Sequence, residues 1–260
     1  MDLNRWQLAL TALAFILLAG VERMFPMRGV REGRWTRWSA NLLMFGLGFG
    51  ALYLASPMLL QAAGWLDRLI PLPPLASLGL PAWLLILVSF LVVDLLNYLA
   101  HVAFHVTPSL WRLHRTHHSD TIVDASTGVR HHPLETIVNT TIQLAIFAVL
   151  GLPVLVVMGY ALIAAVWQFV THLDVRLPEV IDRPLRLLVV TPGMHRIHHS
   201  SEMAEGNSNF GALLSIWDRL FGTYRRRPVD EHSDMVLGVA GFTTGQGPGG
   251  PLLEPFRTQR

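Results

Sequence analysis

The sequence predicts an all-α integral membrane protein with three N-terminal spanning helices, a helical hairpin and a cytoplasmic helical cap. Of its 260 residues, 52% are hydrophobic and only 15% are charged, whereas a typical soluble domain has about 25% charged residues. The apolar residues gather in long runs, and 11 of the 12 histidines lie between positions 101 and 199. The arginines form no dense stripe with interleaved aromatic residues, so nucleic acid is not an expected partner.

The first two spans are predicted over 6–20 and 40–64. The first run is only about 15 residues long, which is short for a spanning helix. A secretory signal peptide is the alternative interpretation, but no small-residue cleavage site follows the run, and Asp2 replaces the usual basic start. We therefore expect an uncleaved first span.

Arginine counts predict the orientation of these spans. The loop after the first span carries five arginines, namely Arg23, Arg28, Arg31, Arg34 and Arg37. The proline-rich loop 65–81 carries only Arg68. Because cytoplasmic loops hold the excess of basic residues, the first loop is expected in the cytoplasm and the N-terminus outside.

The third span is predicted to start near Trp83 and to end at the first histidines. Its polar residues lie at offsets of 0, 3, 4, 7 and 11, which is one helical stripe; they are Asp94, Asn97, Tyr98, His101 and His105. An ionisable group in a span is a functional hypothesis, because facing lipid is expensive. A packing aspartate satisfied by a neighbouring helix is the alternative for Asp94.

Residues 137–169 form another apolar stretch, interrupted by Gly-Leu-Pro at 151–153. The first half covers about 20 Å, against a hydrocarbon core of about 30 Å. A shallow hairpin that enters and returns on the cytoplasmic side is therefore predicted. A single kinked span, the alternative, would place the later histidines on the opposite face of the membrane from the earlier ones.

The rest of the chain is polar enough to be cytoplasmic. Residues 191–193, Thr-Pro-Gly, predict a turn and a helix that starts near Met194. The segment 213–222 is expected to be amphipathic, and the Gly- and Pro-rich tail is expected to be loosely ordered, with His232 a bystander. These features divide the chain into 1–81 with N-terminal spans and loops, 82–228 with the histidines, and 229–260 as tail.

The histidines fall into spacings that a helix converts into metal sites. Two are four residues apart, and two further groups share spacings of three and four; they are His101 and His105, then His114, His117 and His118, then His195, His198 and His199. Imidazole suits iron, zinc, copper or nickel. One ion accepts about four to six donors, so eight clustered histidines predict a dimetal site. The absence of cysteine excludes thiolate zinc sites and iron–sulfur clusters.

Several other functions compete with a two-metal enzyme. A membrane zinc metallohydrolase needs only three protein ligands, and no His-Glu-x-x-His stretch is present. A metal transporter would place its donors near the bilayer midplane. A bis-histidine haem protein needs two axial ligands, and a membrane scaffold needs no metal.

Several motifs resemble one known family: HVAFH, LWRLHRTHHSD, TGVRHHPLE and VTPGMHRIHHS, followed by NSNFGALLSIWDRLFGTYRRRP. From about Leu91 to Pro228 the chain resembles bacterial members of the fatty acid hydroxylase/sterol desaturase superfamily. The resemblance implies a fatty acid hydroxylase-type catalytic domain whose iron ligands are His101, His105, His114, His117, His118, His132, His172, His195, His198 and His199. Position 131 is usually aromatic in such sequences, so the role of His131 stays open.

The resemblance also implies a function. It indicates a di-iron oxygenase that hydroxylates or desaturates a lipid (fatty acyl, sterol-like or ether lipid) with O2. Electrons would come from a separate reductase system through a ferredoxin or cytochrome b5-like protein, because no flavin or nicotinamide fingerprint is present. The expected location is a bacterial inner membrane, with the metals on the cytoplasmic side.

Ligand histidines need an acceptor for the second ring nitrogen. The nearby candidates for this supporting role are Asp94, Asp120, Asp124, Glu135 and Asp174, of which we select Asp94, Asp124 and Glu135. No catalytic residue beyond the metal site is identified.

Overall fold

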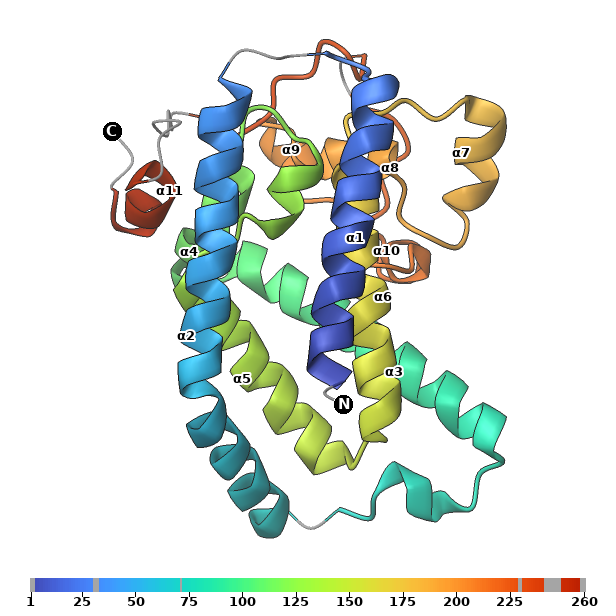
Figure 1. Ribbon diagram of the computed structural model, residues 1–260. Coiled ribbons are helices and arrows are strands. Elements are labelled where there is room, and N and C mark those ends of the chain that lie inside the picture. Colours follow the sequence, from blue (N-terminus) through green and yellow to red (C-terminus); the bar gives the residue numbers. More distant parts are fainter. Residues whose placement is uncertain (1–2, 30–32, 71, 229–230, 241–248, 258–260) are drawn as a thin grey trace.

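The computed structural model describes residues 3–29, 33–70, 72–228, 231–240 and 249–257, which are helical apart from loops and two isolated β-bridges (Figure 1). Arg31 of the first basic loop and Asp2 lie outside the described residues. The α-helices are α1 (Leu3–Met24), α2 (Arg34–Leu69), α3 (Ala82–Val106), α4 (Pro108–His118), α5 (Pro133–Leu150), α6 (Val154–His172), α7 (Glu179–Leu185), α8 (Pro192–His198), α9 (Met203–Gly206), α10 (Ile216–Leu220) and α11 (Gly249–Leu253). Short 3-10 helices are η1 (Leu75–Leu78), η2 (Ala125–Val129) and η3 (Glu254–Phe256).

Five helices are long and apolar enough to cross a membrane: α1, α2, α3, α5 and α6. Their outward surfaces carry exposed apolar side chains such as Leu54, which is 78% exposed. Such exposure would be costly in water, whereas lipid accepts it at no cost. The described chain therefore has the composition and surface of a membrane protein.

The hairpin arms are longer than the sequence pattern indicates. Helix α5 has 18 residues and α6 has 19, because α5 already begins at Pro133, a favoured first helical residue, and α6 continues to His172. At 1.5 Å per residue each arm covers about 27 Å, close to the thickness of the hydrocarbon core. Both arms thus qualify as candidate spans, where the sequence predicted a shallow hairpin.

The two arms return to the same end of the bundle (Figure 1). Gln168 near the end of α6 lies 2.6 Å from the ring of His131, just before α5. Gly151 closes α5 in the left-handed conformation with φ of 56°, and a Cβ there would lie 2.7 Å from Pro74. The hairpin interpretation therefore holds, and a single kinked span does not fit.

Buried polar contacts join the first basic loop to the histidine-bearing end of the bundle. The guanidinium of Arg37 in α2 pairs with Asp120 at 2.9 Å and with Asp124. The carboxylate of Glu22 in α1 accepts the backbone N–H groups of Ala125 and Asp174. The basic loop and the histidines consequently lie at the same end of the helices.

The described parts of the tail pack against the cap. Met235 and Leu237 are buried in a cluster with Val123 and Ile197. Further along, Glu254 forms a buried ion pair with Arg115 of α4 at 2.7 Å. The Gly- and Pro-rich composition predicted a loosely ordered tail. The contacts are made by a few apolar and charged residues, and an average over the composition of the segment does not show them.

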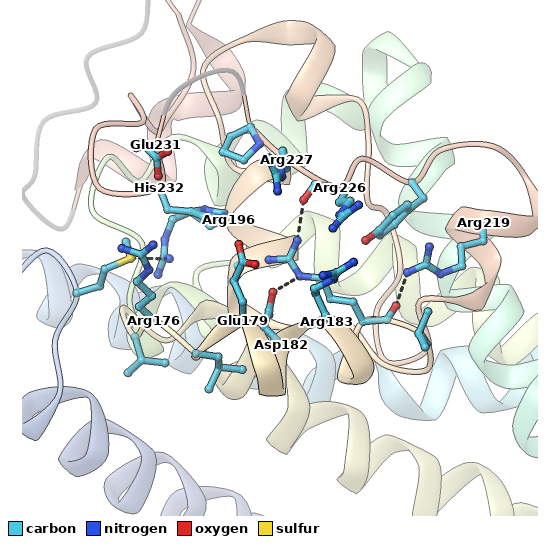
Figure 2. A pocket seen from close by; sticks show the side chains of 18 residues that line it. Arg176, Glu179, Asp182, Arg183, Arg196, Arg219, Arg226, Arg227, Glu231 and His232 are labelled. Carbon is cyan, nitrogen blue, oxygen red and sulfur yellow. Dashed lines mark hydrogen bonds and ion pairs between the residues drawn. The ribbon is translucent and has the colours of Figure 1, made fainter.

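Helix α8 separates two cavities. One, of about 280 Å³, lies between α3, α5 and α6 and ends at the histidines. The other, of about 470 Å³, is lined by arginines from the cap (Figure 2).

Candidate metal centre

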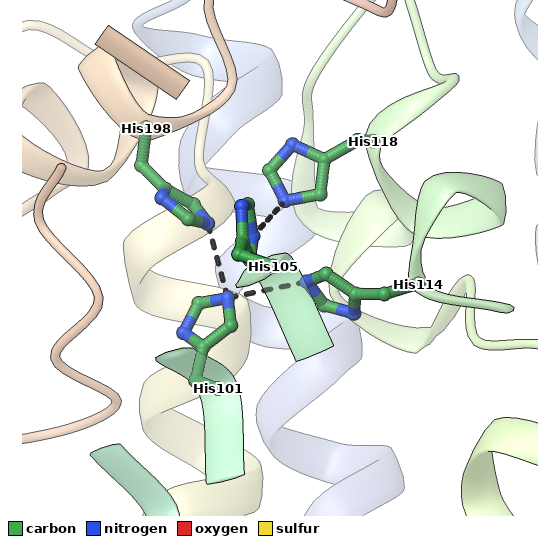
Figure 3. A group of neighbouring side chains, drawn as sticks. All are labelled: His101, His105, His114, His118 and His198. Carbon is green, nitrogen blue, oxygen red and sulfur yellow. Dashed lines mark hydrogen bonds between the residues drawn. The ribbon is translucent and has the colours of Figure 1, made fainter. Parts of the chain in front are cut away.

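Five histidines from three helices form a first group (Figure 3). Their Nε2 atoms point toward one another: His101 lies 3.2 Å from His114 and 3.0 Å from His198, and His105 lies 3.1 Å from His118. One candidate ligand atom from each ring lies within 4.8 Å of all the others. The group therefore surrounds a space that one ion could fill.

A second group contains four buried histidines: His117, His172, His195 and His199. The Nε2 atom of His172 lies 3.2 Å from that of His117 and 3.1 Å from those of His195 and His199. The last two are themselves 3.2 Å apart. His172, at the end of the hairpin, is thus the hub of this group.

Helical geometry explains how adjacent histidines serve different groups. Neighbouring residues on a helix point about 100° apart. On α4, His118 joins the first group while His117 joins the second. At the end of α8, His198 and His199 divide in the same way. This division is what an interpretation with two ions requires.

The chemistry of these rings fits a metal better than hydrogen bonding alone. A neutral ring nitrogen either carries a proton or offers a lone pair. In the triangle of His172, His195 and His199 at least one pair must therefore consist of two donors or two acceptors. A central cation removes this conflict, because every lone pair can then point at it.

Burial favours the neutral form that binds metal. It lowers the pKa of the rings outside the spanning helices well below 6.5, and the neighbouring histidines lower it further; these rings are His117, His118, His195, His198 and His199. Neutral imidazole is the metal-ligating species. The site is therefore ready for a cation near neutral pH.

The far side of several rings is held by hydrogen-bond acceptors. The Nδ1–H of His101 donates to the carbonyl of Phe210 at 2.7 Å, and that of His198 donates to the carbonyl of Ser208 at 2.8 Å. His172 donates in the same way to the carbonyl of Gln168 at 2.6 Å. A proton on Nδ1 leaves the Nε2 lone pair free to face the centre of its group. All three acceptors are backbone atoms, which no sequence motif reveals.

Glu135 is the acidic residue that contacts a clustered ring directly. Its carboxylate accepts from Nδ1 of His114 at 2.7 Å and from Nδ1 of His131 at 3.0 Å. Burial lowers the pKa of His131, but the ion pair with Glu135 outweighs burial and raises the pKa above 6.5. The His131 ring stacks on that of His117, with centroids 4.6 Å apart. His131 therefore lies beside the two groups and turns no nitrogen into either.

Three predicted residues lie apart from the two histidine groups. His132 lies outside both groups: its Nδ1 accepts the backbone N–H of Leu134, and its Nε2 bonds to the carbonyl of Leu252. The structure thus places His132 at the start of α5 with both ring nitrogens bonded to the backbone. Asp94 and Asp124 contact no histidine among the described residues.

Asp94 and Asp124 instead hold helices together. Asp94 accepts from the hydroxyl of Tyr160 at 2.6 Å and from the indole of Trp217 at 2.7 Å. Asp124 accepts from Arg37 and Trp38 of α2. The first therefore joins α3, α6 and the cap, while the second fixes α2 to the loop after α4.

We expect Glu135→Gln to lower metal affinity by about 10- to 100-fold, because the charged acceptor for the His114 ring is lost. Competition with a chromogenic chelator on purified protein measures this affinity. Asp124→Asn is the matched control, because Asp124 is equally buried but touches no clustered ring. Equal affinities in the two variants would remove the supporting role of Glu135.

The cavity of about 280 Å³ reaches the histidines from the side of the spanning helices. Its wall combines apolar residues with hydrogen-bonding side chains that the histidine spacings do not indicate; the polar ones are Asn97, Thr136, Asn139, Thr140, Gln168 and Thr171. Rings from both groups line its end, including those of His101 and His172. A molecule in this cavity would lie against both groups.

Comparisons with known proteins point to lipid hydroxylases and monooxygenases. The family model described as fatty acid hydroxylase matches residues 86–223, more than half of the chain. An ornithine lipid hydroxylase of Rhizobium tropici is 34% identical over 159 residues, which are 61% of this chain and 46% of that protein. Human alkylglycerol monooxygenase is 32% identical over 155 residues, which cover 58% of this chain and 32% of the enzyme.

A fatty acid hydroxylase of a Lecanicillium species is 30% identical over 168 residues, which are 59% of this chain and 46% of that protein. In each case the match spans less than half the length of the relative. No solved structure matches the chain.

Proposed function

Because this chain belongs to the fatty acid hydroxylase family, we propose that it is an O2-dependent di-iron enzyme that hydroxylates or desaturates a membrane lipid. The observation that carries the proposal is the convergence of nine histidines in two adjacent groups. The family match and the lipid-oxidising relatives support the reaction class.

The proposed ligand set follows the geometry. One iron would be held by the first group and the other by the second; the ligands are His101, His105, His114, His118 and His198, then His117, His172, His195 and His199. Compared with the set that the sequence implies, His132 is left out. Glu135 would orient the His114 ring from behind.

Bound iron would supply the two-electron activation of O2 that no amino-acid side chain provides. The protein's own residues perform the remaining tasks. The carbonyls of Phe210, Ser208 and Gln168 fix the ring orientations. Burial of the second group and of three rings of the first would limit the access of bulk water to the reacting carbon.

The substrate would enter from the bilayer through the cavity between α3, α5 and α6. Its polar wall, with Asn97, Asn139 and Thr140, suits a lipid that carries a hydrogen-bonding group near the attacked carbon. Asn97 and Asn139 already accept from Gln143, and a hydrogen-bonding group on the lipid would add a partner for wall groups such as the hydroxyl of Thr140. We therefore propose a polar lipid as the substrate class.

The electron source and the orientation complete the proposal. A separate ferredoxin or cytochrome b5-like protein would deliver electrons. The metal groups lie at the same end of the bundle as the arginine-rich first loop. Arg37, near the start of α2, pairs with Asp120, which follows His118 by two residues. If that loop is cytoplasmic, as the excess of arginines predicts, the metals are on the cytoplasmic side, in a bacterial inner membrane.

Metal analysis of detergent-purified protein tests the proposal. We expect about two irons per chain, one for each histidine group. Prolonged dialysis against a chelator is expected to remove the metal and to lower the melting temperature, because the ring nitrogens then face one another without a cation. One zinc per chain would favour a metallohydrolase, and protein without metal would contradict the site.

Lipid profiling identifies the substrate. A strain without the gene is expected to lack one hydroxylated or desaturated polar lipid, which expression of the wild-type chain restores. An unchanged lipid profile, together with full iron content, would contradict the substrate class but not the metal site.

A further inference from the structure

The cap contains a second cavity (Figure 2), and none of the nine clustered histidines lines it. Its volume is about 470 Å³, and seven arginines but only three carboxylates line it. The arginines come from the segment after α6, from α7 and α8, and from residues 219–227. Chain segments far apart in sequence thus build one strongly basic hollow.

Two buried arginines form its floor. Arg186 pairs with Asp182, and Arg196 of α8 donates to the carbonyl of Leu173 at 2.9 Å. Gly193 allows this arrangement, because a Cβ at that position would lie 2.5 Å from the Arg186 guanidinium. The floor is therefore a fixed arrangement of guanidinium groups.

Four arginines on the rim are exposed: Arg176, Arg183, Arg226 and Arg227. Within the described residues, their guanidinium groups make no hydrogen bond and no ion pair. Like charges brought together in this way repel one another unless an anion lies between them. The rim is thus built to receive a negative charge from outside the chain.

The shape and the residue type favour phosphate as the anion. Guanidinium is planar and pairs with two phosphate oxygens at once. The hollow has the size of a small-molecule site, whereas a protein partner would dock on a flatter and larger surface. The chemistry therefore points to a phosphate group on a small molecule.

The depth of the cavity favours a lipid as its source. Met27 and Arg176 line the cavity, and they follow the ends of α1 and α6 by only three and four residues. The headgroup layer extends about 5–7 Å beyond the hydrocarbon core on each side. In a bilayer crossed by α1 and α6, the cavity would therefore lie at the level of the lipid phosphates.

Helix α7 and the turn after it support this depth. Val180, Leu187 and Leu188 are 82%, 59% and 66% exposed, while Arg183 on the same helix lines the cavity. A short helix with exposed apolar side chains and a charged face is typical of the membrane interface.

We propose that the arginine cavity binds the phosphate group of an anionic phospholipid headgroup. Arg183, Arg226 and Arg227 would contact the phosphate from the rim, and Arg186 and Arg196 would stabilise its charge from below. Helix α8 lies between this cavity and the metal groups, because it carries Gly193 and Arg196 as well as His195. A bound headgroup would stabilise α8. This helix carries the proposed ligands His195 and His198, and His199 follows at its end.

Titration of the detergent-purified full chain with dihexanoyl phosphatidylglycerol tests the proposal, with the melting temperature as readout. We expect a saturable rise for the wild type. The triple variant Arg183→Gln, Arg226→Gln, Arg227→Gln is expected to need at least about tenfold more lipid, because the loss of even one charge-assisted contact costs about that factor. The single variant Arg183→Gln should lie between the two. Arg68→Gln, which changes an exposed arginine in the last turn of α2, is the matched control.

Two further ligands distinguish the sources. Inorganic phosphate and uncharged dihexanoylglycerol, at the same concentrations, are expected to cause no saturable shift. A saturable shift with inorganic phosphate alone would assign the cavity to soluble phosphates and overturn the lipid source. Equal lipid responses in the wild type and the triple variant, or a response to dihexanoylglycerol, would overturn the site itself. Iron content is measured in the same samples, so a failure of the metal site is seen separately.

Discussion

Replacing His172 with alanine is expected to abolish lipid turnover and to lower bound iron by about one ion per chain. The Nε2 atom of His172 lies 3.1–3.2 Å from the Nε2 atoms of three other buried histidines. No described side chain stands ready to replace it, since the ring nitrogens of His131 are engaged by Glu135 and Gln168. Iron is measured on purified protein, and turnover by lipid profiling of the complemented strain.

His132→Ala is the matched control for this prediction. His132 belongs to the same histidine-rich stretch, but its ring nitrogens bond to the backbone of Leu134 and to that of Leu252. We expect this variant to keep the iron content of the wild type. Loss of iron in His132→Ala, or its full retention in His172→Ala, would contradict the division of the histidines into two groups.

The second large effect concerns stability. Arg37→Ala is expected to destabilise the protein by about 3–5 kcal/mol, because it removes the cation that pairs with the buried carboxylates of Asp120 and Asp124. Arg37 is 2% exposed and joins α2 to the loop that follows α4. For a chain of this size, the loss corresponds to a fall of roughly 10 °C in melting temperature.

Arg23→Ala provides the comparison. Arg23 lies in the last turn of α1 and its side chain is exposed, and exposed substitutions usually change stability by less than about 0.5 kcal/mol. Thermal unfolding of both variants in the same detergent separates a structural arginine from one that only contributes charge. Similar melting temperatures would show that the Arg37 ion pairs add little.

Arg37 and Arg28 show what a count of charges leaves out. The orientation argument treats all five arginines of the first loop alike. In the structure Arg37 is neutralised by buried carboxylates, and a guanidinium N–H of Arg28 donates to the carbonyl of Met235. The sequence contains the charges but not their partners, which come from segments about 80 to 200 residues away.

Periodicity and composition were sufficient for the helical character of the chain. The apolar runs predicted the helices, because a segment in lipid must satisfy its own backbone hydrogen bonds. Element lengths were less accurate: α2 has 36 residues, against the 25 predicted. The helix continues beyond the apolar run, through Trp35 and Trp38 at one end and Trp65 at the other, where hydropathy gives no signal for a helix end.

The sequence by itself determined that this is an apolar, helical chain with clustered histidines in spacings suited to two metal ions, because helical periodicity is a local property. Only the tertiary structure decided which ring joins which group, that His172 is a hub, and that His132 is turned away. It also built the arginine cavity from distant segments. The reason is physical: side-chain direction on one helix follows from spacing, but the neighbours of that side chain depend on how separate helices pack.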